Sequence, residues 1–138
     1  MPFTLTTTEN ILSQQAIEKA VKTITESMLK WHGLAGSDIM TPNITSMVNI
    51  LPNDYAFVGG EKASAIWLEW RTPAFAFSDR EIQLGHFKDC TDALFDLAEG
   101  KIPKNKIYIN VVHAVDGAWN FNGGAVTNED MGAALSAG

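Results

Sequence analysis

The chain has 138 residues and a formal net charge of -6, with 46% hydrophobic and 19% charged residues. This length is enough to bury one hydrophobic core without disulfides or a structural metal. The acidic balance, without clusters of lysine and arginine, excludes nucleic acid as a partner. No apolar run approaches the ~20 residues of a membrane span, and the N-terminal residues lack a secretion-signal pattern. The single cysteine, Cys90, suits a reducing compartment, so we expect a cytoplasmic protein.

The first half of the chain predicts a strand, a helix and a second strand. Residues 2 to 8 alternate between apolar and polar side chains, which is typical of a strand. Ser13 is a suitable N-cap for the helix that follows. The apolar stripe of this helix is formed by Ile17, Val21, Ile24, Met28 and Trp31. Glycines at 33 and 36 are expected to end the helix, and residues 44 to 51 form the second strand before Pro52. Residues 54 to 58 predict a short extended piece, followed by a turn at 59 and 60.

The second half repeats this pattern. Residues 65 to 71 predict a third strand, rich in apolar residues that suit a buried sheet. The run Ser78-Asp79-Arg80-Glu81 resembles a capping box, which predicts a helix start at Ser78. The expected core face of that helix is formed by Leu84, Phe87, Thr91, Leu94 and Ala98. Gly100 and Pro103 mark the helix end, and residues 107 to 112 predict the fourth strand.

Two β-α-β units of similar length predict an α/β (α+β) fold with one four-stranded sheet. Each unit pairs its two strands in parallel, and both helices cover the same face of the sheet. We expect the other face to be apolar and therefore covered by a partner, which predicts an oligomer. The organisation is a single domain over residues 1–124, and residues 125–138 form either a tail or an arm that reaches a neighbouring subunit.

Pro2 is the candidate catalytic residue. Removal of Met1 would leave a free secondary amine at the start of the first strand. Burial among apolar groups and a nearby cation both disfavour the protonated amine, so its pKa falls and it becomes a base near neutral pH. The alternative is a Met-Pro start without chemical meaning. If Met1 stays attached, the proline nitrogen is an amide and has no lone pair to act as a base.

Several motifs follow Pro2 in a characteristic order. They are Phe57-Val58-Gly59-Gly60 after Pro52, Ile107-Tyr108-Ile109-Asn110, and Asp116, Trp119, Phe121, Gly124 and Ala125. In this order they resemble the tautomerase superfamily over residues 2 to about 124. The first motif resembles macrophage migration inhibitory factor and the cis-3-chloroacrylic acid dehalogenase group. The second resembles the fourth strand of that factor, and the third resembles malonate semialdehyde decarboxylases.

This resemblance implies a homotrimer in which three sheets form a central barrel. Active sites then lie at subunit boundaries, and Tyr108 reaches the site from the neighbouring subunit. Tyr108 and Asn110 alternate on one strand face, so a hydroxyl and an amide can hold an enolate and a substrate group. The alternative is a half-buried pair bonded to its neighbours in the sheet.

Arg71 closes the third strand near the place where several branches carry a substrate-binding arginine. A guanidinium binds a carboxylate through two parallel hydrogen bonds and would lower the pKa of Pro2 further. The alternative is an arginine in solvent. Trp119 and Phe121 are expected to form an apolar wall that excludes water from the substrate, or else to pack in an interface.

The expected activity is that of a cofactor-independent tautomerase acting on a small 2-keto or unsaturated carboxylic acid. We expect no metal, because His32, His86 and His113 match no ligand spacing. A decarboxylase or hydratase is the alternative enzyme, with Asp38 or Asp116 as its water-activating carboxylate. A non-catalytic trimeric binding protein is the alternative outside enzymes.

Overall fold

The computed structural model describes residues 1–137 as two β-α-β units followed by a small hairpin and a short helix. The strands are β1 (Pro2–Thr8), β2 (Thr45–Leu51), β3 (Phe57–Val58), β4 (Glu61–Lys62), β5 (Ile66–Pro73), β6 (Ile107–Ala114), β7 (Trp119–Phe121) and β8 (Gly124–Val126). The helices are α1 (Gln14–Trp31), α2 (Arg80–Leu97) and α3 (Asn128–Ala137). None of the helices in residues 1–137 is long and apolar enough to cross a bilayer.

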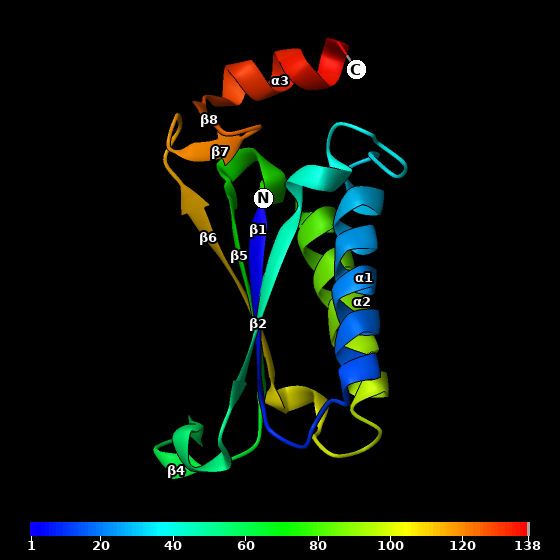
Figure 1. Ribbon diagram of the computed structural model, residues 1–138, viewed down its shortest axis with the longest axis vertical. Coiled ribbons are helices and arrows are strands. Elements are labelled where there is room, and N and C mark those ends of the chain that lie inside the picture. The colour runs from blue at the N-terminus through cyan, green and yellow to red at the C-terminus, as the bar shows by residue number, and fades with distance from the viewer. Residues whose placement is uncertain (138) are drawn as a thin grey trace.

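The central sheet has four strands in the order β2-β1-β5-β6. Within each unit the strands are parallel, β1 with β2 and β5 with β6. The two units meet through the antiparallel pair of β1 and β5. Both long helices lie on one face of this sheet (Figure 1). The predicted fold class, the parallel pairs and the shared helix face are therefore confirmed.

The core lies between the sheet and the two helices. Alternate residues of the central strands point to the helices, so Phe3, Leu5, Leu68 and Trp70 are buried. The rings of Phe3 and Trp70 lie 4.7 Å apart across the β1–β5 pair. Such aromatic pairs contribute to stability beyond the area they bury. This packing anchors the first residues of the chain against the end of β5.

The surface that α2 buries differs from the predicted one. The helix buries His86, Cys90 and Leu94, whereas Leu84 is 56% exposed. The prediction is confirmed for Leu94 and Ala98, which are buried, and wrong for Leu84. Gly85 explains the close approach of the helices, since a Cβ there would meet the ring of Trp31 at 2.1 Å. The histidine is therefore carried into the interface between α1 and α2.

His86 is buried by a polar cluster that links the two helices. Its Nδ1 lies 2.9 Å from the Oγ of Ser27. Beside it, the Asp89 carboxylate accepts hydrogen bonds from the indole of Trp31 at 2.8 Å and from Lys30 at 2.9 Å. Burial lowers the pKa of His86 to about 4, with smaller contributions in the same direction from His32 and Lys30. The helix pair thus depends on a neutral imidazole.

The start of α2 lies one residue later than the capping box predicts. Asp79 is the N-cap, and its carboxylate accepts the backbone N–H of Glu81 at 2.8 Å. Ser78 instead ends the preceding turn (Ala74–Phe77), with helical backbone angles and its hydroxyl donating to the carbonyl of Phe75 at 3.1 Å. An N-cap needs an extended backbone, which Asp79 has and Ser78 lacks.

The open face of the sheet carries polar as well as apolar side chains, which corrects the expectation of an apolar face. Thr4 lies between Met47 on β2 and Glu69 on β5, and Glu69 pairs with Asn110 on β6. The apolar residues among them, such as Met47 and Val112, are 67% and 50% exposed. A sheet face that lines a water-filled space can carry threonine, asparagine and charge, so an uncovered face need not be apolar.

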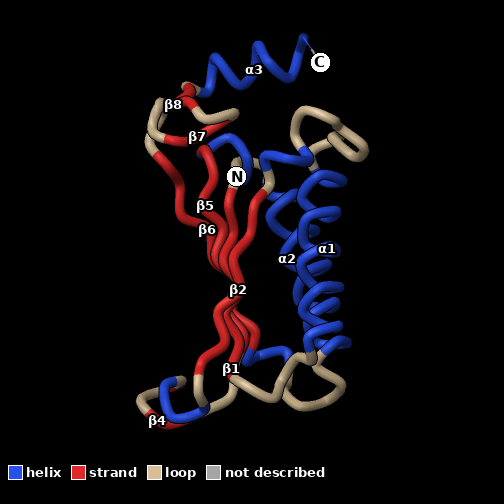
Figure 2. The backbone as a smooth tube through the Cα atoms, in the orientation of Figure 1, coloured by secondary structure: helices blue, strands red, loops and turns tan. Residues whose placement is uncertain are grey.

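The hairpin and α3 lie at the end of the sheet where β1 begins. Figure 2 shows this segment beyond the ends of β5 and β6, next to the N-terminus. The hairpin turn places both Asn122 and Gly123 at positive φ, 50° and 84°, as a two-residue hairpin turn requires. Met131 anchors α3, because its side chain is only 1% exposed.

We expect the buried imidazole to make the fold sensitive to acid. His86 titrates near 6.5 when unfolded and near 4 when folded, so its stabilising contribution is complete above pH 6.5. That contribution is lost as pH falls from 6.5 towards 4, by up to about 3 kcal/mol. Urea unfolding of the wild type and of His86→Gln between pH 7.5 and 4.5 measures how much unfolding free energy each protein loses. The variant should be less stable at pH 7.5 and should lose less stability on acidification. Equal losses would contradict the role of His86.

Candidate functional site

A cavity of about 330 Å³ lies at the end of the sheet where β1 begins. It lies between β1, the ends of β5 and β6, and the β7 strand that follows them. Its wall is formed by Met1, Pro2, Asn43, Thr45, Arg71, Ala114, Ala118, Trp119 and Asn120. Three of the residues predicted from the sequence, Pro2, Arg71 and Trp119, therefore border the same space.

The register of the sheet explains why these residues meet. Pro2 pairs with Thr45 of β2, and Phe3 pairs with Trp70 of β5, so Arg71 follows directly beside Pro2. Phe3 and Trp70 point into the core, so their neighbours Pro2 and Arg71 point to the open face. The cavity thus takes one residue from each of the four strands of the central sheet, since Ala114 of β6 also lines it.

Met1 is bound within this site. Its side chain is only 7% exposed, and its amine donates a hydrogen bond to the Asn43 carbonyl at 2.5 Å. The backbone N–H of Thr45 donates to the Met1 carbonyl at 3.2 Å. Burial lowers the pKa of the Met1 amine to about 6. The location therefore disfavours a charged amine, while the Pro2 nitrogen is a peptide nitrogen as long as Met1 is attached.

Asn43 joins two segments that are distant in sequence. Its Nδ2 donates to the Ile39 carbonyl at 2.8 Å, and its Oδ1 accepts the backbone N–H of Asn122 at 3.4 Å. The loop before β2 is therefore tied to the turn of the β7–β8 hairpin. These contacts hold the Asn43 carbonyl next to Met1, just before the start of β1.

Arg71 carries the only cationic side chain on the cavity wall within residues 1–137, and it is paired with an acid. Its Nη2 lies 2.9 Å from the Oε1 of Glu69, and its Nε donates to the same oxygen at 3.2 Å. The Arg71 side chain is 68% exposed. Exposed ion pairs of this kind contribute little to stability, so a ligand carboxylate can replace Glu69 at small cost.

Trp119 brings a polar atom as well as an apolar ring. Its indole N–H is buried and has no hydrogen-bond partner among the described residues. The ring packs edge-on against Phe75, with centroids 6.4 Å apart. Phe121, two residues further on β7, packs against the core and does not border the cavity.

Tyr108 and Asn110 lie further along β6, on the open face. Tyr108 pairs with Trp67, and Val112 pairs with Arg71. Four residues of strand separate the two pairs, or roughly 13 Å. Within one chain, Tyr108 therefore lies well away from Pro2, and its ring stacks on Trp67 with centroids 6.0 Å apart.

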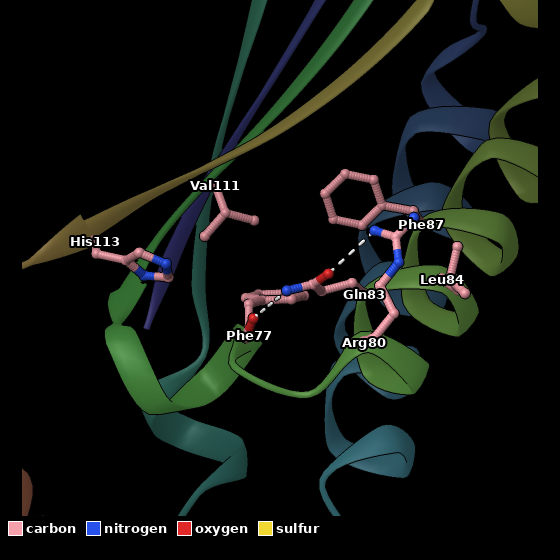
Figure 3. Close-up of a pocket in the computed structure, with 7 residues that line it drawn as sticks. All are labelled: Phe77, Arg80, Gln83, Leu84, Phe87, Val111 and His113. Atoms are coloured by element: carbon pink, nitrogen blue, oxygen red, sulfur yellow. Dashed lines mark hydrogen bonds between the residues drawn. The ribbon is translucent and has the colours of Figure 1, made fainter.

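A second cavity of about 370 Å³ lies between α2 and the outer edge of β6. Figure 3 shows Arg80, Gln83 and Phe87 of α2 facing Val111 and His113 of β6. Arg80 donates to Gln83 at 3.1 Å, and Gln83 donates to the Phe77 carbonyl at 2.6 Å. This cavity shares no residue with the wall of the first cavity, and it includes neither Pro2 nor Arg71.

The other titratable candidates lie elsewhere. Both ring nitrogens of His32 lie near carbonyl oxygens, those of Met28 at 2.8 Å and Ala76 at 2.6 Å, so His32 joins α1 to the turn after β5. Cys90 is buried, and burial raises the pKa of its thiol to about 12. No group of three or more His, Cys, Asp or Glu residues within residues 1–137 is placed to hold a metal ion.

Sequence reasoning missed Asn43, Thr45 and Asn120. Asn43 is the asparagine of a glycosylation sequon, which carries no such role here, and Thr45 is one polar residue among many in β2. Asn120 alternates with Trp119 on a strand of only three residues. No local pattern marks these positions, because they meet only when the hairpin closes over the end of the sheet.

Comparison with known proteins identifies the architecture. No protein-family model and no curated protein matches the sequence. A fused 4-OT, solved as a symmetric trimer, matches with a TM-score of 0.77 at 8% identity, covering 96% of this chain and 99% of that one. A member of the cis-3-chloroacrylic acid dehalogenase family matches with a TM-score of 0.75 at 12% identity, covering 99% and 91%.

A malonate semialdehyde decarboxylase inhibited by 3-bromopropiolate matches with a TM-score of 0.66 at 11% identity, covering 88% of this chain and 89% of that one. All three similarities extend over most of both chains. At these identities they establish the fold and not the activity. The chain has the fold of the tautomerase superfamily, and trimers occur among its structural neighbours.

Proposed function

We propose that the protein is a cofactor-independent tautomerase in which the Pro2 amine, freed by removal of Met1, is the catalytic base. The observation that carries the proposal is the position of Pro2 beside Arg71, on adjacent strands and bordering one cavity. The substrate class is a small 2-oxo or unsaturated carboxylic acid. Its carboxylate binds Arg71, and the carbon next to its carbonyl lies against the Pro2 nitrogen.

The reaction is a proton transfer. The Pro2 amine takes a proton from the carbon beside the carbonyl, the C–H electron pair forms a C=C bond, and the carbonyl π pair moves to oxygen. The resulting enolate becomes the enol when the proton is transferred from the Pro2 amine to its oxygen. Pro2 itself is exposed in the single chain, so the low pKa that the base needs near neutral pH would come from the neighbouring charge of Arg71 and from burial by a neighbouring copy. The carboxylate of Glu69 partly offsets the charge of Arg71 until a substrate takes its place.

The proposal includes a trimer in which Tyr108 and Asn110 come from the neighbouring copy. Both side chains lie on the open face and are too far from Pro2 in their own chain to act there. In the trimer, the hydroxyl of Tyr108 would stabilise the enolate oxygen, and Asn110 would hold a second substrate group. Structural neighbours of this fold are trimeric, which supports such an arrangement.

A decarboxylase or hydratase is the second candidate, because it would use the same cavity. These reactions need a carboxylate that activates water. Asp116 accepts the backbone N–H of Asn128 at 2.6 Å, and neither Asp116 nor Asp38 borders the cavity. Among the described residues, no aspartate or glutamate forms part of its wall, and the carboxylate of Glu69 lies beside it, paired with Arg71.

Removal of the base should abolish turnover. Processed protein should interconvert the enol and keto forms of phenylpyruvate, measured by absorbance of the enol. Pro2→Ala should reduce kcat/KM by at least about 10²-fold, as loss of a general base does. Protein that retains Met1, released from an N-terminal fusion and verified by intact mass, should be equally inactive. Full activity of the Met1-retaining form would contradict the mechanism, and inactivity of processed protein towards 2-oxo acids would favour a binding role.

The Arg71–Glu69 pair should control affinity for the carboxylate. Arg71→Met should raise KM for phenylpyruvate about 10-fold or more, because a charged hydrogen bond is lost. Glu69→Gln should lower KM by up to about 5-fold, because Arg71 no longer has an internal competitor. Lys104→Met breaks the exposed Lys104–Asp92 pair elsewhere on the surface and is the matched control. A raised KM in Glu69→Gln would show that the pair positions Arg71 instead of competing with substrate.

Mixing two inactive variants should reveal a shared site. If Pro2 of one copy works with Tyr108 of the next, mixed trimers of Pro2→Ala and Tyr108→Phe contain some intact sites. Random assembly should restore about a quarter of the wild-type sites after joint refolding. Sedimentation should show a single trimeric species. The absence of recovered activity in such trimers would place Tyr108 outside the site or within the same chain.

A further inference from the structure

Met1 forms part of the cavity wall, and its main-chain groups are held there by hydrogen bonds. Its carbonyl group is bonded directly to the Pro2 nitrogen, and its oxygen accepts the N–H of Thr45 at 3.2 Å. Its amine is bound at the other end by the Asn43 carbonyl. Two main-chain groups on fixed elements therefore hold a carbonyl and a hydrogen-bond donor next to Pro2.

Removal of Met1 leaves the Thr45 N–H without this partner. Thr45 is the first residue of β2, and β2 is an edge strand whose only neighbour is β1. The N–H points towards β1, where Pro2 becomes the first residue, so no further backbone carbonyl precedes it. The processed chain thus presents a rigid N–H donor beside a free amine on the wall of the cavity.

We propose that the backbone N–H of Thr45 is a second oxyanion donor of this site, which binds the carbonyl oxygen of the substrate together with the Tyr108 hydroxyl of the neighbouring copy. This inference rests on the function proposed above. When Pro2 removes the proton, negative charge develops on that oxygen, and a preorganised N–H stabilises it more than it stabilises the neutral ketone. A donor of this kind costs no reorganisation, because the sheet already holds it.

The same geometry sets the direction of the substrate. Thr45 and Arg71 lie on opposite sides of Pro2, each about 4.8 Å away across the sheet. The Asn43 carbonyl is an acceptor and repels a carboxylate, so the carboxylate of the substrate lies at Arg71. The Asn43 carbonyl accepts a hydrogen bond from the Met1 amine. It can accept one from a ligand in the same way, which favours a substrate with a hydroxyl group at that end.

The test compares two reagents that modify the Pro2 amine. With 2-oxo-3-pentynoate, the nitrogen lone pair bonds to C4, the alkyne π pair forms a C2–C3 double bond, and the carbonyl π pair moves to oxygen. The N–H proton then passes to C3, so the product is a simple adduct. With iodoacetamide, the nitrogen displaces iodide from a saturated carbon, and no oxyanion forms. The ratio of the two rates therefore reports the oxyanion donor.

Thr45→Pro removes the N–H and keeps a residue that the start of a strand accepts. Thr45→Ala keeps the N–H and is the reference variant. We expect 2-oxo-3-pentynoate to modify Pro2 about 10- to 100-fold more slowly in Thr45→Pro than in Thr45→Ala. The iodoacetamide rate should differ by less than about 3-fold. Peptide mass spectrometry of the processed N-terminus measures both rates.

A second variant tests the same N–H in case Thr45→Pro does not fold. Semisynthesis with the α-hydroxy acid of threonine at position 45 replaces the amide by an ester, which removes the N–H without a ring. Equal rates with 2-oxo-3-pentynoate, or an equal slowing with both reagents in the ester variant, would overturn the inference. Failure of the proposed function is a separate result, because Pro2 of the wild-type protein would then react with neither reagent faster than an ordinary proline amine.

Discussion

The antiparallel pairing of β1 with β5 is the constraint on which the site depends. Phe3 and Trp70 bury their rings against each other and are essentially inaccessible. A shift of this register by one residue would turn these rings to the open face and remove them from the core. Because that cost is high, Pro2 and Arg71 are held beside each other at the end of the sheet. Phe3 and Trp70 thus set the positions of the proposed reacting groups, although they take no part in the reaction.

The cavity is completed by elements outside the sheet. The β7–β8 hairpin brings Trp119 and Asn120 over the end of β1, and its turn is tied to the loop before β2 through Asn43 and Asn122. α3 is anchored by Met131 and continues from this hairpin. The rigid sheet therefore supplies Pro2, Thr45 and Arg71, while the hairpin supplies the cover. Such a division suits a small site that needs fixed reacting groups and a wall that excludes water.

The helices stabilise the scaffold through a polar interface. His86 and Ser27 are buried between α1 and α2, where apolar side chains would be the usual choice, and Asp89 lies at the partly exposed edge of this interface. The contact of Gly85 with Trp31 draws the helices close enough to bury these groups. A buried neutral histidine makes the scaffold sensitive to acid at a place remote from Pro2. Loss of activity at low pH can therefore arise from the fold as well as from the base.

Local patterns in the sequence were sufficient for the four strands of the central sheet, the two long helices, the two parallel pairs and the shared helix face, because periodicity and turn residues act over short distances. They did not predict the β7–β8 hairpin or α3. Pro2 stood out as the residue after Met1 at the start of a strand, whereas Arg71 and Trp119 were candidates through the resemblance to the tautomerase superfamily. The face of α2, the cap at Asp79 and the polarity of the open face were decided by contacts between distant segments. The same holds for Asn43, Thr45 and the position of Tyr108 relative to Pro2. No local signal exists for these features, because a backbone N–H or an ordinary asparagine gains its role only from the groups that folding brings beside it.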